Sequence, residues 1–216
     1  MAGADKLWLD LQGQPLLART ITAIAATPGL NQLVVVASHQ TLERVEPYHQ
    51  HHPWSLANQW ILGGPTRQDS VYCGLTALPH CDLVLIHDGA RPLTSLALLQ
   101  RGIDAAQQHG AAIAAVPTTD TIKVVDGQEQ IVATPDRANL RAAQTPQVFA
   151  ASLIRAAYAT VGVARALCTD DAAILELAGI PVFTYPGERT NIKVSTPADV
   201  AIVRALWLAL QEGNTL

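Results

Sequence analysis

The sequence predicts an α/β fold in which a mostly parallel sheet carries helices on both faces. Short apolar runs such as Leu33-Val34-Val35-Val36-Ala37 are continuous rather than alternating, which is typical of strands buried on both faces. Segments with helical spacing alternate with these runs, and glycine or proline separates most of them. A length of 216 residues suits one domain, so we expect a single domain over residues 1–216.

The first half of the chain supplies a regular series of elements. Residues 15–27 have apolar side chains at helical spacing, and Pro28-Gly29 would end this helix. Thr94 or Ser95 would cap a later helix at about 95–109, and Gly110 would end it. The other elements expected here are strands at 33–37, 58–62, 82–86 and 111–116 and a helix at 67–78.

The same alternation resumes at residue 150. Helices are expected at 150–160 and 170–178, a strand at 181–185, and a strand or loop at 191–194. The last helix, 197–211, has Thr196 as its cap, with Pro197 in its first turn and Asp199 near its positive end.

Residues 118–147 interrupt the α/β pattern. Two short segments, 121–125 and 130–133, flank Asp126-Gly127, which is a hairpin turn signal. The segment has too few apolar residues to bury itself. We therefore interpret 118–147 as a projecting β-arm that packs on a partner chain, the alternative being an exposed excursion without a partner.

Composition excludes several classes of protein. Apolar residues make up 49% and charged residues 15%, which argues against intrinsic disorder. A net charge of −4 gives no general attraction for nucleic acid or an anionic membrane. No apolar run approaches the roughly 18 residues of a membrane helix, and no secretory signal pattern is visible. Three cysteines without a C-x-x-C pair suggest reduced thiols and a cytoplasmic location.

The motifs of several enzyme classes are also missing. There is no G-x-S-x-G or H-E-x-x-H pattern, so acyl transfer by a serine triad and zinc hydrolysis have no support. The stretch from Tyr48 to His52 matches no metal-site spacing, and we interpret it as a solvated loop.

Isolated cations and small polar residues remain, several of them at strand ends, where parallel sheets bind ligands. Gly63-Gly64 would let a backbone approach a ligand, and a helix starting near Arg67 would present N–H groups to an anion. Asp88 directly follows a predicted strand and suits a sugar hydroxyl or a magnesium ion. Together these residues suit a phosphorylated substrate such as a nucleotide, although each could also be an ordinary surface residue.

Motifs along almost the whole chain resemble those of the 2-C-methyl-D-erythritol 4-phosphate cytidylyltransferases of the non-mevalonate isoprenoid pathway. The segments His87-Asp88-Gly89-Ala90-Arg91-Pro92, Thr145-Pro146-Gln147 and Asn191-Ile192-Lys193-Val194-Ser195, in this order, are the most specific. The others are Asp5-Lys6-Leu7, Gly13-Gln14-Pro15-Leu16-Leu17, Gly63-Gly64 with Arg67, Asp69, Ser70 and Val71, Pro117 with Asp120-Thr121-Ile122-Lys123, Asp136-Arg137, and Thr169-Asp170-Asp171.

The resemblance implies a Rossmann-like nucleotide-diphospho-sugar transferase fold with a β-arm, 118–147, that interlocks two subunits as a homodimer. It also implies transfer of a cytidylyl group from CTP to 2-C-methyl-D-erythritol 4-phosphate, with Mg²⁺. By resemblance, Lys6 stabilises charge at the α-phosphate, while Lys193 and the partner's Arg137 hold the methylerythritol phosphate. Three positions match residues that contact cytidine: Gly63, Gly64 and Ser70. Asp88 matches a residue at the junction of nucleotide and polyol and is also a candidate metal ligand. Four positions match the surroundings of the polyol and its phosphate: Arg91, Thr121, Thr145 and Thr169. Thr169 could instead simply cap the helix that follows it.

One departure from the family concerns the start of the sequence. Family members begin with a strand and a glycine-rich loop, approximately A-A-G-x-G-x-R-M, and residues 1–6 resemble only the end of that loop. The natural protein could be longer by a strand of about six residues and a loop of roughly ten. Alternatively, the chain could be inactive, or active with a different phosphate cradle. We expect the 216-residue chain to fold poorly and to turn over slowly, because a central strand and the anion-binding loop would be missing.

Two rival functions share these motifs. A ribitol-5-phosphate cytidylyltransferase would carry most of the same segments, and comparison of the two polyol phosphates as substrates separates the two enzymes. A truncated relative that binds CTP without chemistry is the other alternative, and it would bind CTP without turnover.

Overall fold

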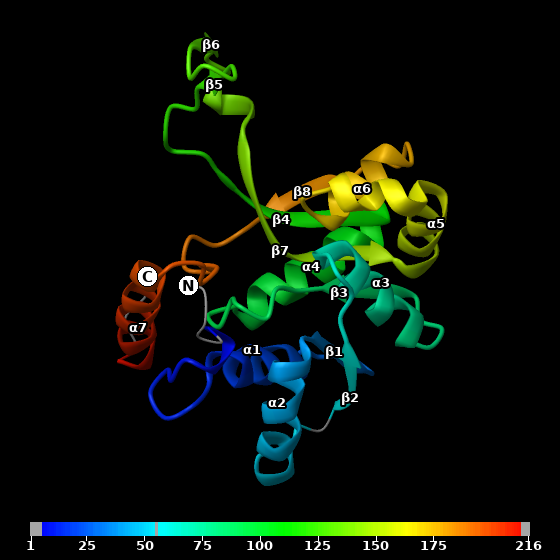
Figure 1. Cartoon of the computed structure of the whole chain (residues 1–216), viewed down its shortest axis with the longest axis vertical. Coiled ribbons are helices and arrows are strands. Elements are labelled where there is room, and N and C mark those ends of the chain that lie inside the picture. The colour runs from blue at the N-terminus through cyan, green and yellow to red at the C-terminus, as the bar shows by residue number, and fades with distance from the viewer. Residues whose placement is uncertain (1–5, 55, 213–216) are drawn as a thin grey trace.

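The computed structural model describes residues 6–54 and 56–212, and Figure 1 shows its course. The α-helices are α1 (Leu16–Ala25), α2 (His39–His51), α3 (Arg67–Ala77), α4 (Leu96–His109), α5 (Ala151–Val161), α6 (Asp171–Leu177) and α7 (Pro197–Gln211). The strands are β1 (Leu33–Ala37), β2 (Ala57–Leu62), β3 (Leu83–Ile86), β4 (Ala111–Pro117), β5 (Val124–Val125), β6 (Ile131–Ala133), β7 (Arg141–Ala150) and β8 (Phe183–Pro186). Short 3-10 helices are η1 (Lys6–Trp8), η2 (Arg137–Asn139) and η3 (Gly162–Leu167).

The described sheet consists of two separate parts and the arm hairpin. β1 pairs with β2 in parallel, and the larger part has the strand order β3-β7-β4-β8. β4 and β8 are parallel, whereas β7 runs antiparallel between β3 and β4. The α/β class with a mostly parallel sheet and helices on both faces is confirmed. The sheet is interrupted between β1 and β3, since no described strand lies between them.

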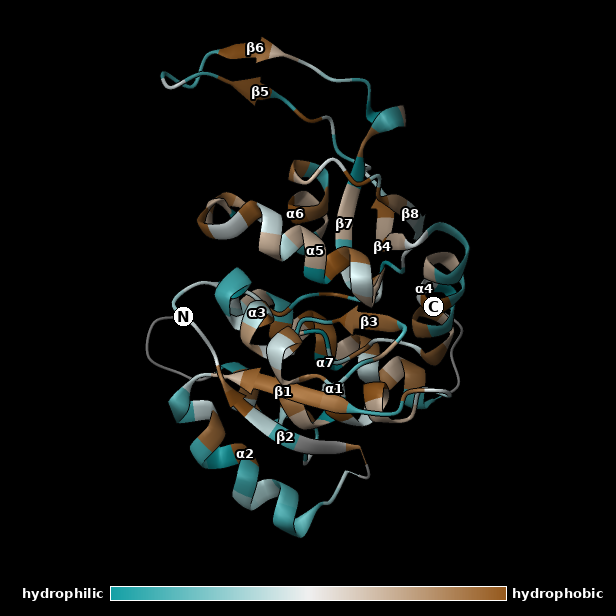
Figure 2. Ribbon diagram, turned by 90° about the vertical axis from the view of Figure 1, so that its right-hand side faces the viewer, coloured by the Kyte–Doolittle hydropathy of each residue, from teal (hydrophilic) through white to brown (hydrophobic). Residues whose placement is uncertain are grey.

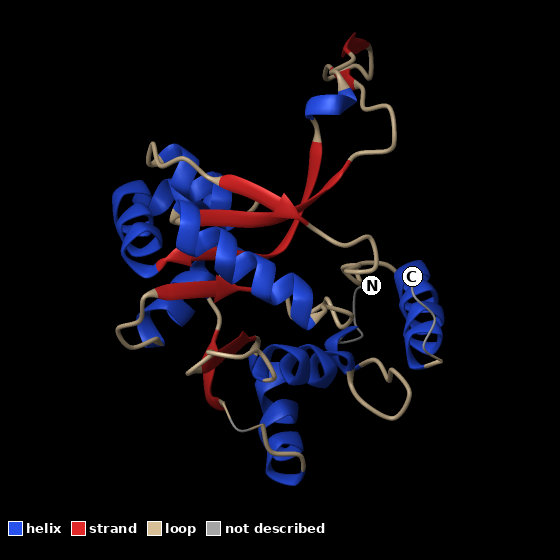
Figure 3. Cartoon of the chain, turned by 180° about the vertical axis from the view of Figure 1, so that it is seen from behind, coloured by secondary structure: helices blue, strands red, loops and turns tan. Residues whose placement is uncertain are grey.

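β4 shows why a continuous apolar run predicts a buried parallel strand. Ala111 and Ile113 belong to the largest hydrophobic cluster, which also contains residues of α5 and α6. Ala112 and Ala114 pack on the opposite face, against Leu98 of α4. Each face of β4 is therefore covered by a helix, so neither face can be polar. Figure 3 shows these helices on both sides of the sheet.

Local capping chemistry sets several helix ends as predicted. The Ser95 side chain accepts a hydrogen bond from the Leu98 amide, and Gly110 ends α4 with a φ of 80°. Thr196 and Asp199 form a reciprocal capping box at the start of α7.

One local prediction is wrong, and one alternative is excluded. Tyr48 to His51 lie in the last turn of α2 rather than in a loop. The rings of Tyr48 and His49 stack on Trp54, and the His52 ring stacks on Tyr48. This packing extends the helix beyond what its polar sequence indicates. The cap of α6 is Asp170, whose side chain accepts from the Ala173 amide, and not Thr169.

A close contact at Gly102 explains why this position of α4 has no side chain. A Cβ atom there would lie 2.5 Å from Tyr185 Oη and 3.0 Å from Val148 Cγ2. Tyr185 cannot move freely because its hydroxyl donates to Pro146 O at 2.7 Å. The sheet and α4 can therefore approach each other only with glycine at this position.

We expect Gly102→Ala to lower the free energy of unfolding by about 1–2 kcal/mol, since overpacking outweighs the gain in helix propensity. Urea denaturation measures this difference. Gly127→Ala is the control, because nothing lies within 4 Å of its Cβ position. Equal stability of the two variants would contradict the close contact.

The segment between β4 and β7 forms the hairpin predicted at 118–147. β5 and β6 pair antiparallel, and Figure 1 shows this hairpin projecting from the domain. Asp126 Oδ1 accepts from the amides of Gln128 and Gln130 and so closes the turn. Residues 141–147 are different, because they belong to β7 and Arg141, Ala142, Ala143 and Gln147 pair with β4. The projecting part is therefore 118–140.

Among the described residues, no single helix is both long and apolar enough to cross a membrane. One sharply bent pair, Ala151–Leu167 with Asp171–Leu177, meets the length and composition criteria only when its two parts are taken together.

Candidate active site

Asp88 is the centre of the candidate site. It follows β3, and its side chain is only 13% exposed. Its Oδ2 lies 3.1 Å from Lys193 Nζ and 3.3 Å from Arg91 Nε, and its Oδ1 lies 3.5 Å from Arg67 Nε. Three cations thus surround one carboxylate, which leaves an excess of positive charge beside the end of β3. Such an arrangement favours the binding of an anion.

The segment that contains Lys193 is fixed to the sheet by Asn191. This side chain is fully buried and donates from Nδ2 to Thr145 O at 2.8 Å. Its backbone oxygen accepts from Arg91 Nη1 at 2.7 Å. The Val194 amide also donates to Ala90 O, so both sides of Lys193 are anchored. Asn191 therefore brings a distant part of the chain to Asp88.

Thr145 supports Asp88 from β7. Its buried hydroxyl accepts from the Asp88 amide at 3.0 Å. This contact holds the backbone of Asp88 rather than its carboxylate. Thr145 and Thr169, from separate segments, also line a cavity of about 230 Å³ beside Asp88. Its other lining residues are Arg67, Arg91, Ala143, Gln144, Gln147, Asp170 and Lys193.

Arg67 and Asp171 are site residues for which the sequence predicted no catalytic or binding role. Arg67 is the first residue of α3, and its Nη2 donates to Asp171 Oδ2 at 2.8 Å. Asp171 is fully buried and also accepts from the Tyr158 hydroxyl at 2.8 Å. The sequence did contain a signal for Arg67, which opens a helix directly after a glycine loop. No local pattern relates it to Asp171, because 104 positions separate the two residues.

The charges of the site follow from burial and pairing. Burial alone would raise the pKa of Asp88, but Lys193, Arg67 and Arg91 outweigh it and hold this pKa below its usual value. Burial raises the pKa of Asp171 even though Arg67 opposes the shift. Burial lowers the pKa of His87 to about 4, so the imidazole is neutral at pH 7. His87 Nε2 lies 2.9 Å from Thr94 Oγ1.

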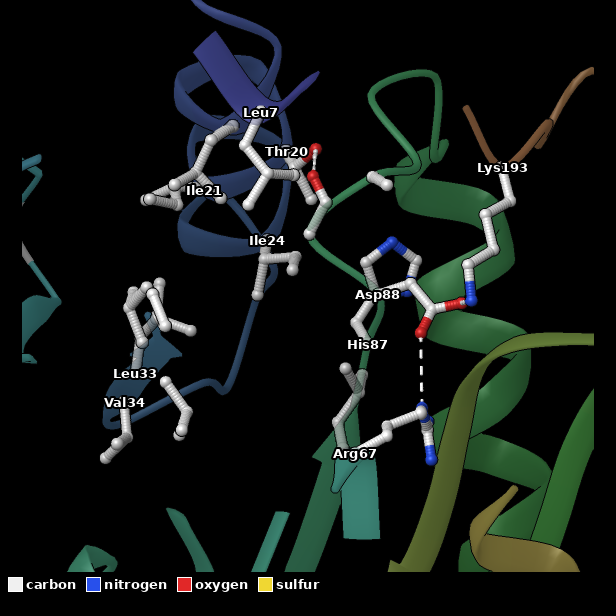
Figure 4. Close-up of a pocket in the computed structure, with 17 residues that line it drawn as sticks. Leu7, Thr20, Ile21, Ile24, Leu33, Val34, Arg67, His87, Asp88 and Lys193 are labelled. Carbon is white, nitrogen blue, oxygen red and sulfur yellow. Dashed lines mark hydrogen bonds and ion pairs between the residues drawn. The ribbon is translucent and has the colours of Figure 1, made fainter. Parts of the chain in front are cut away.

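A second cavity, of about 340 Å³, lies between the two parts of the sheet (Figure 4). Apolar side chains of α1 and all five residues of β1 line it, and Leu85 lines it from β3. Figure 2 shows β1 and β3 as hydrophobic ribbons. Its polar residues include Arg67, Asp88 and Lys193, so the cavity reaches the candidate site.

The structure brings together five of the predicted site residues: Asp88, Arg91, Thr145, Thr169 and Lys193. Other predicted residues lie elsewhere. Lys6 is in η1, lines neither cavity, and its charge acts on Asp199 of α7. Thr121 and Arg137 are exposed on the arm, and Arg137 Nη1 donates to Thr119 O at 3.2 Å.

The glycine loop lies against α3. Ser70 Oγ donates to Thr66 O at 3.0 Å and comes within 3.4 Å of Gly64 O. A Cβ atom at Gly63 would lie 2.6 Å from Ser70 Oγ, and one at Gly64 would clash with Asp69. Both glycines are therefore required by the approach of the loop to α3, in addition to any ligand contact.

Asp88 is a poor ligand for a magnesium ion in the described arrangement. Both of its carboxylate oxygens already face cations. The described residues contain no group of three or more His, Cys, Asp or Glu side chains that could hold a metal ion. The residues present therefore do not form a cage for Mg²⁺ on their own.

Known proteins share both the sequence and the fold. A family model described as 2-C-methyl-D-erythritol 4-phosphate cytidylyltransferase matches residues 1–208. Proteins with this name from Dehalococcoides mccartyi and Gloeobacter violaceus are 39% and 44% identical over 206 and 207 residues, which are 95% of this chain and 89% of each relative.

Two solved structures extend the likeness to the fold. The 4-diphosphocytidyl-2C-methyl-D-erythritol synthase of Anaerococcus prevotii has a TM-score of 0.86 at 28% identity, covering 94% of this chain and 93% of its own. The 2-C-methyl-D-erythritol 4-phosphate cytidylyltransferase of Thermus thermophilus has a TM-score of 0.77 at 33% identity, covering 93% and 92%. The family expected from the motifs is thereby confirmed: this chain belongs to the 2-C-methyl-D-erythritol 4-phosphate cytidylyltransferase family.

Proposed function

We propose that the chain transfers the cytidylyl group of CTP to 2-C-methyl-D-erythritol 4-phosphate in isoprenoid precursor biosynthesis. The single observation that carries this proposal beyond family membership is the cluster of Arg67, Arg91 and Lys193 around Asp88. Two polyanions must meet in this reaction, and their mutual repulsion has to be offset by fixed positive charge. We also propose a cytoplasmic location, which suits the three free cysteines.

The reaction needs no nucleophilic side chain. An oxygen of the substrate phosphate attacks the α-phosphorus of CTP, forming a P–O bond, and the bond to the β-phosphate oxygen breaks to release pyrophosphate. A phosphate monoester has a second pKa of about 6, so it is largely a dianion at neutral pH and requires no general base. The protein positions the two anions and stabilises the charge that develops.

The residue roles follow from position. Arg91 and Lys193 would hold phosphate oxygens in the 230 Å³ cavity, with Thr145 and Thr169 beside them. By resemblance to the family rather than by position, Gly63, Gly64 and Ser70 would contact the cytidine part of CTP, and Lys6 would neutralise the α-phosphate. Mg²⁺ would enter with the nucleotide, since this ion is commonly held by substrate phosphates with only one or two carboxylates.

The arm is proposed to join two copies of the chain. Five of its apolar side chains are at least 40% exposed in the protomer: Ile122, Val124, Val125, Ile131 and Val132. Contiguous exposed apolar side chains mark interaction surfaces. In the dimer, Arg137 and Thr121 of one copy would reach the active site of the other.

The activity is tested by incubating the chain with CTP, Mg²⁺ and each of two polyol phosphates. We expect pyrophosphate and 4-diphosphocytidyl-2-C-methyl-D-erythritol only when methylerythritol phosphate is present, at a low rate. Ribitol 5-phosphate as the better substrate would overturn the assignment. Calorimetric binding of CTP without any turnover would instead support a non-catalytic relative.

Ile131→Asp combined with Val132→Asp is expected to convert a dimer into a monomer, because it places two charges in the apolar surface of the arm. Sedimentation velocity reports the change. Val163→Asp is the matched control, since Val163 is 91% exposed and lies outside the arm. A monomeric parent chain, or a dimer that survives both arm substitutions, would rule out dimerisation through the arm.

A further inference from the structure

A line of four side chains leads from the interior of the protein to Asp88. The Tyr158 hydroxyl of α5 donates to Asp171 Oδ1, and Asp171 Oδ2 accepts from Arg67 Nη2, both at 2.8 Å. Arg67 Nε then lies 3.5 Å from Asp88 Oδ1. Each member belongs to a different segment, so the line ties α5, α6 and α3 to the residue that follows β3.

Asp171 is the fixed point of this line. Its side chain is fully buried, and its amide donates to Gln147 Oε1 at 3.1 Å. Gln147 is itself only 1% exposed. An ionised carboxylate at such a depth is unfavourable unless it is paired, and Arg67 supplies the pair. Because Asp171 cannot swing outward, the position of Arg67 is determined from the interior.

Arg67 is suited to connect two carboxylates. Its planar guanidinium uses Nη2 for Asp171 while Nε faces Asp88, which a lysine ammonium on its flexible stem cannot reproduce. The third nitrogen, Nη1, is buried and has no hydrogen-bond partner in the described structure. The orientation of the guanidinium therefore depends on its two carboxylates, and Asp171 is the closer and more buried of them.

We propose that Asp171 is a positioning residue that acts through Arg67 to fix the Asp88 carboxylate in the active site. The inference deepens the proposed cytidylyl transfer and rests on it. Asp171 and Tyr158 touch no substrate in this arrangement. They determine where Arg67 places its charge, and Arg67 in turn holds the carboxylate that faces Arg91 and Lys193.

Kinetics of Arg67→Lys, Asp171→Asn and the double variant test the proposal. We expect each single variant to lower kcat about tenfold or more while changing KM for CTP less than threefold, because residues that orient a site residue commonly have effects of this size. The double variant should be no slower than the slower single variant, since both changes break one line of contacts. Tyr158→Phe keeps the ring and should give a smaller loss. Glu176→Gln, on the exposed side of α6, is the control and should retain the parent kcat.

A crystal structure of Asp171→Asn decides the matter independently of activity. We expect the Arg67 guanidinium to move out of ion-pairing distance of Asp88, from the 3.5 Å that separates Nε and Oδ1 in the parent chain. If it stays there, or if the two substitutions reduce kcat additively, Asp171 is not a positioning residue. If the parent chain shows no turnover, the proposed function fails, and the position of Arg67 in the Asn and Phe variants still decides the inference.

Discussion

Asp88→Asn is expected to lower the free energy of unfolding by about 3 kcal/mol at pH 7, because it leaves three neighbouring cations without their shared carboxylate. Asp88 is 13% exposed, and Arg91, with a side chain 9% exposed, is equally enclosed. Lys193 is 41% exposed, so water screens part of its repulsion. The substitution preserves shape and removes charge, so packing does not contribute to the difference.

The pH dependence of this loss has a definite sign. The folded-state pKa of Asp88 lies below its usual value because the three cations outweigh burial. A carboxyl group of this kind adds stability above its unfolded pKa, which is about 3.9, and loses it as pH falls through the folded value. The difference between parent and Asp88→Asn should therefore be complete at pH 5–8 and should disappear in stronger acid.

Urea denaturation at several pH values measures this difference. Asp104→Asn is the control, because Asp104 is exposed on α4 and accepts only from Gln100 Nε2 in the described structure. If Asp88→Asn unfolds at the same urea concentration as Asp104→Asn at pH 7, the Asp88 carboxylate adds nothing to the stability of the folded protein by pairing with the three cations.

The sequence predicted those parts of the fold that short-range chemistry determines. β4 could be predicted because both of its faces are covered, so each of its residues from Ala111 to Val116 is apolar. The ends of α4 and α7 could be predicted because their caps form within a few residues. The last turn of α2 could not, because the aromatic side chains that stabilise it meet only in the folded chain.

The same distinction applies to the site. Asp88 and Arg91 belong to one motif. The position of Asp88 after β3 predicted that its side chain lies at the ligand-binding edge of the sheet. The contact between Asp88 and Lys193 depends on Asn191, which forms hydrogen bonds to residues of two other segments. The pair of Arg67 and Asp171 is a long-range feature, with 104 positions between its two members. Periodicity and spacing carry no information about such pairings. The slow folding of the chain and its slow turnover, which the sequence leads us to expect, stay predictions.

Two isoleucines test how the cavity between β1 and β3 affects stability. Ile154 of α5 is fully buried within the largest hydrophobic cluster. Ile21 of α1 is 3% exposed, so it is almost equally buried, but it lines the cavity of about 340 Å³. The two positions share the same side chain, the same helical backbone and nearly the same exposure. They differ in whether neighbouring atoms surround the side chain on all sides.

Ile154→Ala should therefore lower the free energy of unfolding by about 4 kcal/mol and Ile21→Ala by only about 2 kcal/mol. A side chain beside a void already lacks part of its dispersion contacts, so truncation removes less. The change in helix propensity is the same in both variants and cancels in the comparison. Urea denaturation of the two proteins under identical conditions gives the difference. Equal losses would mean that α1 and β1 close around Ile21 in solution, so that no void lies beside this side chain.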